Sequence, residues 1–173
     1  FMRPVERAAV APVAALRDRL LVPGGAGDTG FFLVVLWLLA QLNPALPFFE
    51  AGNIVDATGP ALHDFVVTTI SVALTLAAFG LFVSVLLAAD RGALGWTLIL
   101  LTVALWCKFT MASLMLKPNL TAMWMSESRV AGLLAGLALF LPLRRLRRRA
   151  RTYLAIVCLL AGALFAKIFG EYS

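Results

Sequence analysis

Six arginines fall within eight residues between two apolar runs, and this cluster constrains the fold of the whole chain. They are Arg144, Arg145, Arg147, Arg148, Arg149 and Arg151. Guanidinium groups resist transfer across hydrocarbon, and loops rich in Lys and Arg beside membrane spans stay on the cytoplasmic side. We therefore expect this loop to be cytoplasmic and its arginines to contact anionic lipid headgroups.

The composition is typical of a membrane protein. Hydrophobic residues make up 62% of the 173 residues and charged residues 14%, whereas about 25% are charged in soluble domains. The net charge of +6 suggests nucleic acid as one candidate partner. However, the basic residues flank apolar runs, which favours phospholipids and argues against nucleic acid. Cys107 and Cys158 lie inside apolar runs without a CxxC motif, so no disulfide framework is expected.

Five apolar segments are candidates for membrane spans, because about 20 mostly apolar residues cross the hydrocarbon core. They lie near residues 30–49, 64–89, 93–116, 123–143 and 152–169. The predicted fold is all-α, a polytopic transmembrane helix bundle of about five spans over residues 30–173. Residues 1–29 are predicted to form a short amphipathic cytoplasmic segment. An alternative is that these residues are the trailing end of another element, since the start of the chain at Phe1 gives no clear context.

Counting spans outward from the arginine loop gives the orientation of every other loop. The N-terminal segment and Asp90-Arg91 are then cytoplasmic, whereas Glu50–His63 and Lys117–Ser128 face the periplasm. Most of the basic residues fall inside, in agreement with the positive-inside rule. We expect a multi-pass protein of the bacterial inner membrane, with a cytoplasmic N-terminus and a periplasmic C-terminus.

Lys108 is the most conspicuous ionisable residue, because it lies about 22 Å along a helix that begins at Ala93. A cation at that depth is costly and should pair or reach an interface. Glu127 is the first expected partner and Asp64 the second. Lys108, Glu127, Arg129 and Lys117 form a candidate ligand-binding cluster in the outer half of the membrane. The alternative is a salt bridge that only fixes helix packing, and this is the more common role of such residues.

Other polar and small residues fit helix packing. Gln41, Asn43 and Pro44 interrupt the first span, and we interpret them as a kink held by interhelical hydrogen bonds, with a substrate-lining role as the alternative. Gly132 and Gly136 form a GxxxG motif that favours close helix approach, either within the bundle or against another subunit. His63 is the single histidine, and we interpret it as an interfacial polar residue, with a haem or pigment ligand as the alternative. No catalytic motif or metal-ligand spacing is present in the sequence, so no metal or cofactor beyond phospholipids is predicted.

Several stretches resemble a known family. They are RDRLLVPG, WLLAQLNPALPFFEAG over Trp37–Gly52, KFTMASLMLKPNLTAMWM and VAGLLAGLALFLPLRR. Together they resemble the C-terminal membrane half of proteobacterial proteins of the VanZ-like family, over most of residues 17–150. The resemblance implies a cell-envelope membrane protein, in a family named for glycopeptide (teicoplanin) resistance, without a defined reaction. The family's upstream acidic, Gln, Arg and Asn-Gly signatures have no counterpart here, so the chain is expected to be the second half of a longer protein or a relative that lost them.

Two functions from different classes are consistent with these features. The first is a VanZ-like envelope protein whose outer polar cluster meets a lipid or a lipid-linked envelope precursor. The second is a noncatalytic accessory subunit of a larger membrane complex, favoured by the GxxxG face and the spans that polar residues interrupt. A transporter is less favoured, because the five spans show no internal repeat.

Overall fold

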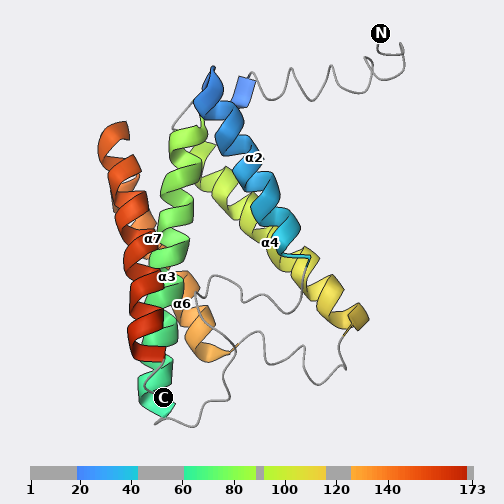
Figure 1. Ribbon diagram of the computed structural model, residues 1–173, viewed down its shortest axis with the longest axis vertical. Helices are drawn as coiled ribbons and strands as arrows, with labels where there is room; N and C mark the ends of the chain where they lie inside the picture. Colours follow the sequence, from blue (N-terminus) through green and yellow to red (C-terminus); the bar gives the residue numbers. More distant parts are fainter. Residues whose placement is uncertain (1–18, 43–60, 89–91, 116–125, 171–173) are drawn as a thin grey trace.

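The computed structural model describes residues 19–42, 61–88, 92–115 and 126–170, and almost all of them are helical. The five helices are α2 (Gly25–Ala40), α3 (Ala61–Leu86), α4 (Ala93–Met115), α6 (Glu127–Leu143) and α7 (Arg148–Gly170). Figure 1 shows their arrangement. The predicted all-α fold is confirmed for the described residues. Most of the predicted N-terminal amphipathic segment lies outside them.

Three of the helices are long and apolar enough to cross a membrane. The corresponding stretches are Phe65–Leu86, Ala93–Met111 and Arg148–Ile168. Helices α2 and α6 have only 16 and 17 residues, or about 24 and 26 Å at 1.5 Å per residue, against a hydrocarbon core of about 30 Å. The structure therefore indicates a membrane-embedded protein, and the count of five spans stays a prediction.

The helix ends differ from the predicted ones at both flanks of the arginine cluster and in the first span. Helix α7 begins at Arg148 rather than near residue 152, so half of the cluster lies in its first turn. Helix α6 begins at Glu127 rather than near residue 123. Helix α2 begins at Gly25 rather than at residue 30, and it ends at Ala40. A charged side chain does not by itself end a helix. The backbone hydrogen bonds of the helix continue wherever the charged group can reach a polar partner.

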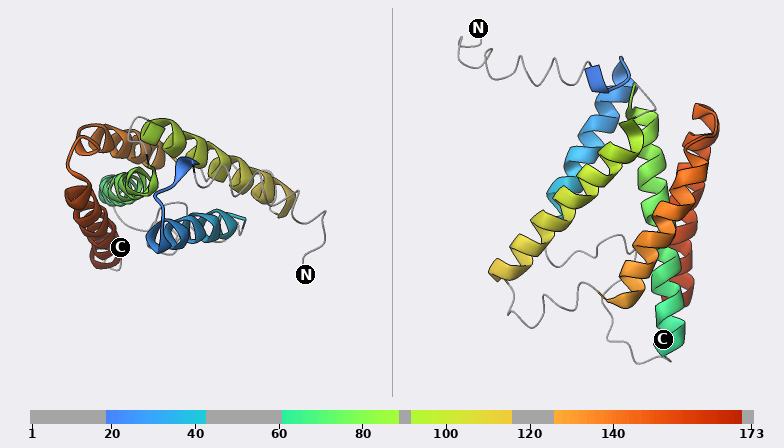
Figure 2. Two further views of the ribbon diagram at one scale, coloured as in Figure 1. Left: turned by 90° about the horizontal axis from the view of Figure 1, so that it is seen from above. Right: turned by 180° about the vertical axis from the view of Figure 1, so that it is seen from behind.

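Helix α3 is the central element of the bundle. Half of its most apolar stretch is buried, against 22% for α4 and 17% for α7. Helices α6 and α7 pack along its length, whereas α2 and α4 contact it much less. Seen from above, the other four helices surround α3, and α4 extends away from it (Figure 2). The α3 surface therefore supplies most of the core.

The helices alternate in direction, so that the connections gather at two ends. In Figure 1, α2, α4 and α7 run downward, and α3 and α6 run upward. The exposed Arg19 and the connection over residues 144–147 therefore lie at the same upper end. We call this the arginine end. This arrangement matches the alternation that the sequence predicts for the five segments.

The segment before α2 is fastened to the end of α3 by main-chain hydrogen bonds. The N–H of Val22 donates to the carbonyl oxygen of Leu86 at 3.0 Å, and the N–H of Ala88 donates to that of Leu20 at 2.9 Å. Gly24 then turns the chain into α2 with a φ of 102°, a conformation that favours glycine. The arginine end is thus tied together through backbone as well as side chains.

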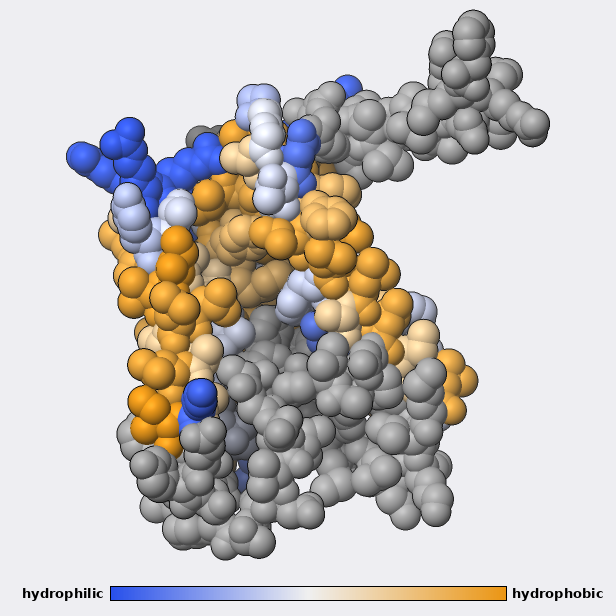
Figure 3. All heavy atoms as spheres, viewed as in Figure 1, coloured by the Kyte–Doolittle hydropathy of each residue, from blue (hydrophilic) through white to orange (hydrophobic). Residues whose placement is uncertain are grey.

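The outer surfaces of the helices are strongly apolar. Figure 3 shows hydrophobic side chains along the described helices and hydrophilic ones at the upper, arginine end. The exposed apolar side chains include large ones on α2, α4 and α7, among them Phe32, Leu39, Trp106, Phe109, Leu160 and Leu164. Soluble proteins rarely expose so many large apolar side chains together. It fits contact with lipid tails.

Candidate functional site

Lys108 belongs to the face of α4 that points into the bundle. The buried residues of α4 recur at intervals of three or four, which is the period of one helix face. They are Ala93, Thr97, Leu101, Ala104 and Lys108. Only 3% of the Lys108 surface is exposed. The cation is therefore held inside the protein rather than among lipid tails, as ionisable groups in membrane spans usually are.

Gln41 ends the corresponding buried face of α2. Gly27, Gly30 and Val34 precede it on that face, and only 5% of the Gln41 surface is exposed. Its side-chain Nε2 donates to the carbonyl oxygen of Trp37 at 3.2 Å. Its Oε1 is buried without a hydrogen-bond partner. The atom that donates to Trp37 is the amide nitrogen, so the other polar atom of the side chain, Oε1, is a hydrogen-bond acceptor.

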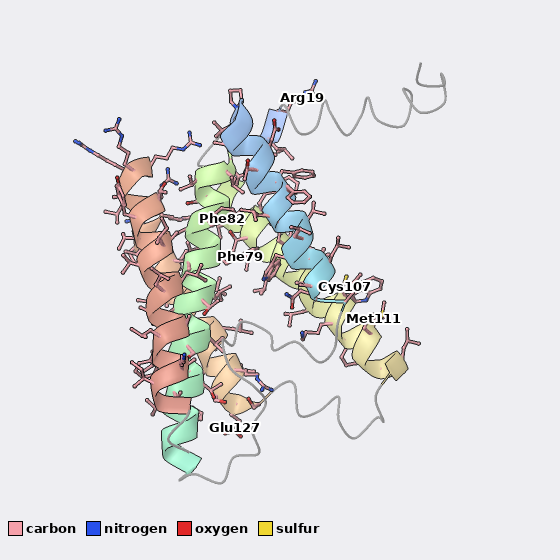
Figure 4. All side chains as sticks on the ribbon, in the orientation of Figure 1. Arg19, Phe79, Phe82, Cys107, Met111 and Glu127 are labelled. Atoms are coloured by element: carbon pink, nitrogen blue, oxygen red, sulfur yellow. The ribbon has the colours of Figure 1, made fainter. Side chains whose placement is uncertain are left out.

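The two buried polar residues lie at the same level of the bundle. Trp37 stacks on Phe79 with ring centroids 4.2 Å apart, and both pack against a core cluster that contains Leu101 and Ala104. Gln41 follows Trp37 by one turn, and Lys108 follows Ala104 by one turn. Figures 2 and 4 show the last turn of α2 beside α4 near the labelled Cys107. We call this pair the Gln41–Lys108 site.

The predicted outer cluster is not brought together by the described residues. Glu127 is exposed at the start of α6, and Figure 4 shows it at the lower end of the bundle, apart from Cys107 and Met111 on α4. Lys108 lies in sequence between those two residues. The expected Lys108–Glu127 pair is therefore absent from the described part of the chain, because α4 diverges from α3 while α6 follows it. Arg129 lies half-buried beside Glu127 in α6, and Lys117 lies outside the described residues.

The glycines of the GxxxG motif contact α3 inside the bundle. A Cβ on Gly132 would lie 2.7 Å from the Cβ of Val72, and one on Gly136 would lie 2.8 Å from the carbonyl oxygen of Ala73. Thr69 on α3 also donates a hydrogen bond to the carbonyl oxygen of Ser128 at 3.2 Å. The motif thus serves close packing of α6 on α3, and its glycine face is not available to another subunit.

Two of the six clustered arginines bond to the end of α3. Arg148 donates to the carbonyl oxygen of Val85, and Arg151 donates to that of Ser84 at 3.5 Å. Carbonyls in the last turn of a helix have no partner within the helix and carry the negative end of its dipole, so cations there are stabilising. Arg151 is only 3% exposed. It therefore contributes to packing of α7 on α3 rather than to the lipid-facing surface expected for it.

The other four arginines remain at the surface of the arginine end. Arg145, Arg147 and Arg149 are exposed, and Arg144 is partly exposed. Leu146 lies among them and is exposed as well. An apolar side chain between cations suits the boundary between lipid tails and headgroups. These residues keep the geometry that the predicted contact with anionic lipid needs.

The structure says little about the remaining candidate residues. Asn43 and Pro44 lie outside the described residues, as does the side chain of His63 in α3. Cys107 and Cys158 are free cysteines on different helices. Among the described residues, no group of three or more His, Cys, Asp or Glu side chains could hold a metal ion.

The sequence analysis did not place Gln41 and Lys108 at the same level of the bundle. A signal was present, because both residues continue a buried stripe by a step of one turn.

Comparisons of the chain with protein-family models, with curated proteins and with solved structures find no match.

Proposed function

We propose that the chain is a polytopic protein of the bacterial inner membrane in which all five helices cross the bilayer. Three helices of sufficient length, the alternating directions of all five and the apolar outer surface support this proposal. The arginine end faces the cytoplasm, since polybasic loops are retained there. The opposite end, with Glu127, faces the periplasm. The resemblance to VanZ-like proteins is the reason for assigning the chain to the cell envelope.

In this proposal the protein binds the anionic headgroup of a lipid or of a lipid-linked envelope precursor at the Gln41–Lys108 site, and it carries out no reaction there. The carrying observation is that Lys108 is buried on the inward face of α4. A lysine in a membrane span costs about 2.5–3.5 kcal/mol on insertion scales, so an apolar residue would serve packing better. A lysine ammonium binds phosphate groups as a point charge, so a buried lysine suits recognition of an anionic headgroup.

The alternative function is a noncatalytic accessory subunit of a larger membrane complex. The GxxxG motif was one reason for this hypothesis. Because Gly132 and Gly136 face α3, the motif does not provide a surface for a partner. The lipid-binding function is therefore the better supported of the two.

The substitution Lys108→Met tests the proposal. It keeps an unbranched apolar side chain but removes the charge, and one charge-assisted hydrogen bond is worth about 1.5–3 kcal/mol. We expect anionic lipid to bind at least about tenfold more weakly, as measured by native mass spectrometry of the full chain released from nanodiscs. The matched control is Lys167→Met, because Lys167 is an exposed lysine in the last turn of α7, and α7 runs in the same direction as α4 (Figure 1).

The outcome separates binding from packing. Weaker lipid binding by a folded Lys108→Met protein, with the control unchanged, supports the proposal. Unchanged lipid binding contradicts it. If the methionine variant does not fold, Lys108→Arg decides: a folded arginine variant that binds lipid like the wild type supports the proposal, and one that has lost the lipid assigns Lys108 to packing.

A further inference from the structure

We infer that the outer face of α7, made up of Arg149, Tyr153, Leu160 and Leu164, binds one anionic glycerophospholipid from the leaflet at the arginine end. In this arrangement the phosphate lies against Arg149, and the acyl chains lie along the helix below it. The site is separate from the Gln41–Lys108 site, because Lys108 lies in the second half of α4, which runs away from the arginine end (Figure 1). The lipid at α7 therefore goes beyond the proposed function.

One side of α7 is held against α3. Arg151 is 3% exposed and Ala155 9%, and a Cβ on Gly162 would lie 3.1 Å from Oγ1 of Thr75 on α3. With 3.6 residues per turn, these three positions of α7 fall within a sector of about 40°. The bonds from Arg148 and Arg151 to carbonyl oxygens of α3 fix the rotation of the first turn. The opposite side of α7 therefore points away from the bundle.

The residues of the outer face lie on this opposite side. Arg149 is exposed, Tyr153 is 70% exposed, Leu160 63% and Leu164 59%. The four positions fall within a sector of about 60°, roughly opposite the buried sector. Figure 3 shows hydrophilic side chains at the upper end of α7 and hydrophobic ones below them. The outer face thus changes from cationic to aromatic to aliphatic along the helix.

This order of side chains matches the profile of a phospholipid. Arginine binds phosphate oxygens through two parallel hydrogen bonds. Tyr153 follows Arg149 by one turn, or about 6 Å, and tyrosine favours the headgroup level of a bilayer. From Tyr153 to Leu164 the helix rises about 17 Å, close to half of the hydrocarbon core of about 30 Å. The aliphatic part of the outer face is therefore about as long as the acyl chains of one leaflet.

The charges around Arg149 select an anionic headgroup. Arg145 and Arg147 are also exposed, and the first turn of α7 contains no acidic residue. Arginines at a membrane surface attract anionic lipids. The ammonium group of a choline or ethanolamine lipid would instead add a positive charge to a positive surface. A lipid with a net negative charge, such as phosphatidylglycerol, therefore fits best.

A second copy of the chain fits the outer face less well than a lipid. Contacts between membrane helices favour small residues, which let two backbones approach closely. The outer face carries large side chains, and Gly162 is used against α3. Two copies packed through α7 would also bring their exposed arginines together, which is unfavourable. We therefore assign the face to lipid.

Site-specific quenching by brominated lipids tests the inference. In the full chain with Cys107→Ala and Cys158→Ala, a bimane label is attached after Val157→Cys, an exposed position of α7, or Val103→Cys, an exposed position at a similar distance from the start of α4. The label is read in nanodiscs of phosphatidylcholine and phosphatidylglycerol, with bromine on the acyl chains of one lipid at a time. We expect phosphatidylglycerol to be preferred about fivefold at Val157→Cys, the effect of one arginine at the membrane surface, and much less at Val103→Cys.

Variants of the arginines assign the preference to one side chain. Arg149→Met should lower the preference at Val157→Cys to the level at Val103→Cys, and Arg149→Lys, which keeps the charge, should retain most of it. Arg147→Met is the matched control, because it removes one exposed charge from a residue that precedes the first turn of α7. It should keep the preference.

Four results would overturn the inference. Equal preferences at Val157→Cys and Val103→Cys, or equal losses in Arg149→Met and Arg147→Met, would mean a diffuse attraction to the whole arginine end. An unchanged preference in Arg149→Met would exclude that side chain. Lack of quenching by either lipid at Val157→Cys would assign the face to a protein contact. Loss of the preference on adding millimolar glycerol phosphate would identify a soluble phosphate, rather than a lipid, as the ligand.

Discussion

Replacing Gly136 by leucine should disrupt the contact between α6 and α3 and lower the free energy of unfolding by roughly 3 kcal/mol or more. A Cβ at Gly136 would lie 2.8 Å from the carbonyl oxygen of Ala73 and 2.9 Å from the Cβ of Leu76. The first of these atoms is main chain, so it cannot move aside without displacing α3. Separation of the two helices would open the centre of the bundle, because α3 supplies most of the core.

The effect can be measured by thermal unfolding of the purified chain in mild detergent. The matched control is Gly95→Leu in α4, where a Cβ would meet no atom within 4 Å. The control variant should differ from the wild type only by the small change in helix propensity. Equal melting temperatures for Gly136→Leu and the wild type would show that α6 does not pack on α3 in this way.

The second large effect concerns the arginines at the end of α3. Replacing Arg148 and Arg151 together by methionine should lower the free energy of unfolding by about 2–4 kcal/mol, since a hydrogen bond from a charged group contributes about 1.5–3 kcal/mol. Both side chains donate to carbonyl oxygens in the last turns of α3. Their loss leaves those carbonyls without donors and removes two cations from the negative end of the helix dipole.

A second double variant separates this local effect from the loss of net charge. The double variant Arg145→Met with Arg149→Met also removes two positive charges, but from exposed positions. Surface charges contribute little to stability. We expect it to melt close to the wild type in neutral detergent. Equal destabilisation of the two double variants would mean that the bonds to Ser84 and Val85 do not hold α7 in place.

Much of the fold could be predicted from the sequence, because long apolar runs dictate helices wherever backbone groups must be satisfied without water. The α3 and α4 helices begin and end within about three residues of the predicted segments. The start of α7 was harder to predict. Excluding arginines from the span is sound for a side chain that faces lipid, but Arg148 and Arg151 reach carbonyls of α3 instead. Those carbonyl groups are 60 or more residues away in the chain, and no local sequence pattern predicts the contacts.

The candidate site could be predicted only in part. Lys108 stood out because a cation within an apolar run is costly, but its neighbours depend on which helices diverge. Glu127 was expected beside Lys108 because both were placed in the outer half of the membrane, whereas α4 extends away from α3 (Figure 2). Gln41 was interpreted as part of a kink, and its hydrogen bond to Trp37 is indeed local. The unsatisfied Oε1 beside α4 becomes visible only once the two helices are placed.

The alternating topology is tested most directly by accessibility from the two sides of the membrane. In a chain with Cys107→Ala and Cys158→Ala, one cysteine is introduced at a time, as Glu127→Cys or Arg145→Cys, both at exposed positions at opposite ends of α6. A membrane-impermeant maleimide should label the Glu127→Cys protein from the periplasmic side of sealed cells, and the Arg145→Cys protein only after the membrane is permeabilised. Labelling of both proteins from the same side would contradict a membrane-spanning α6.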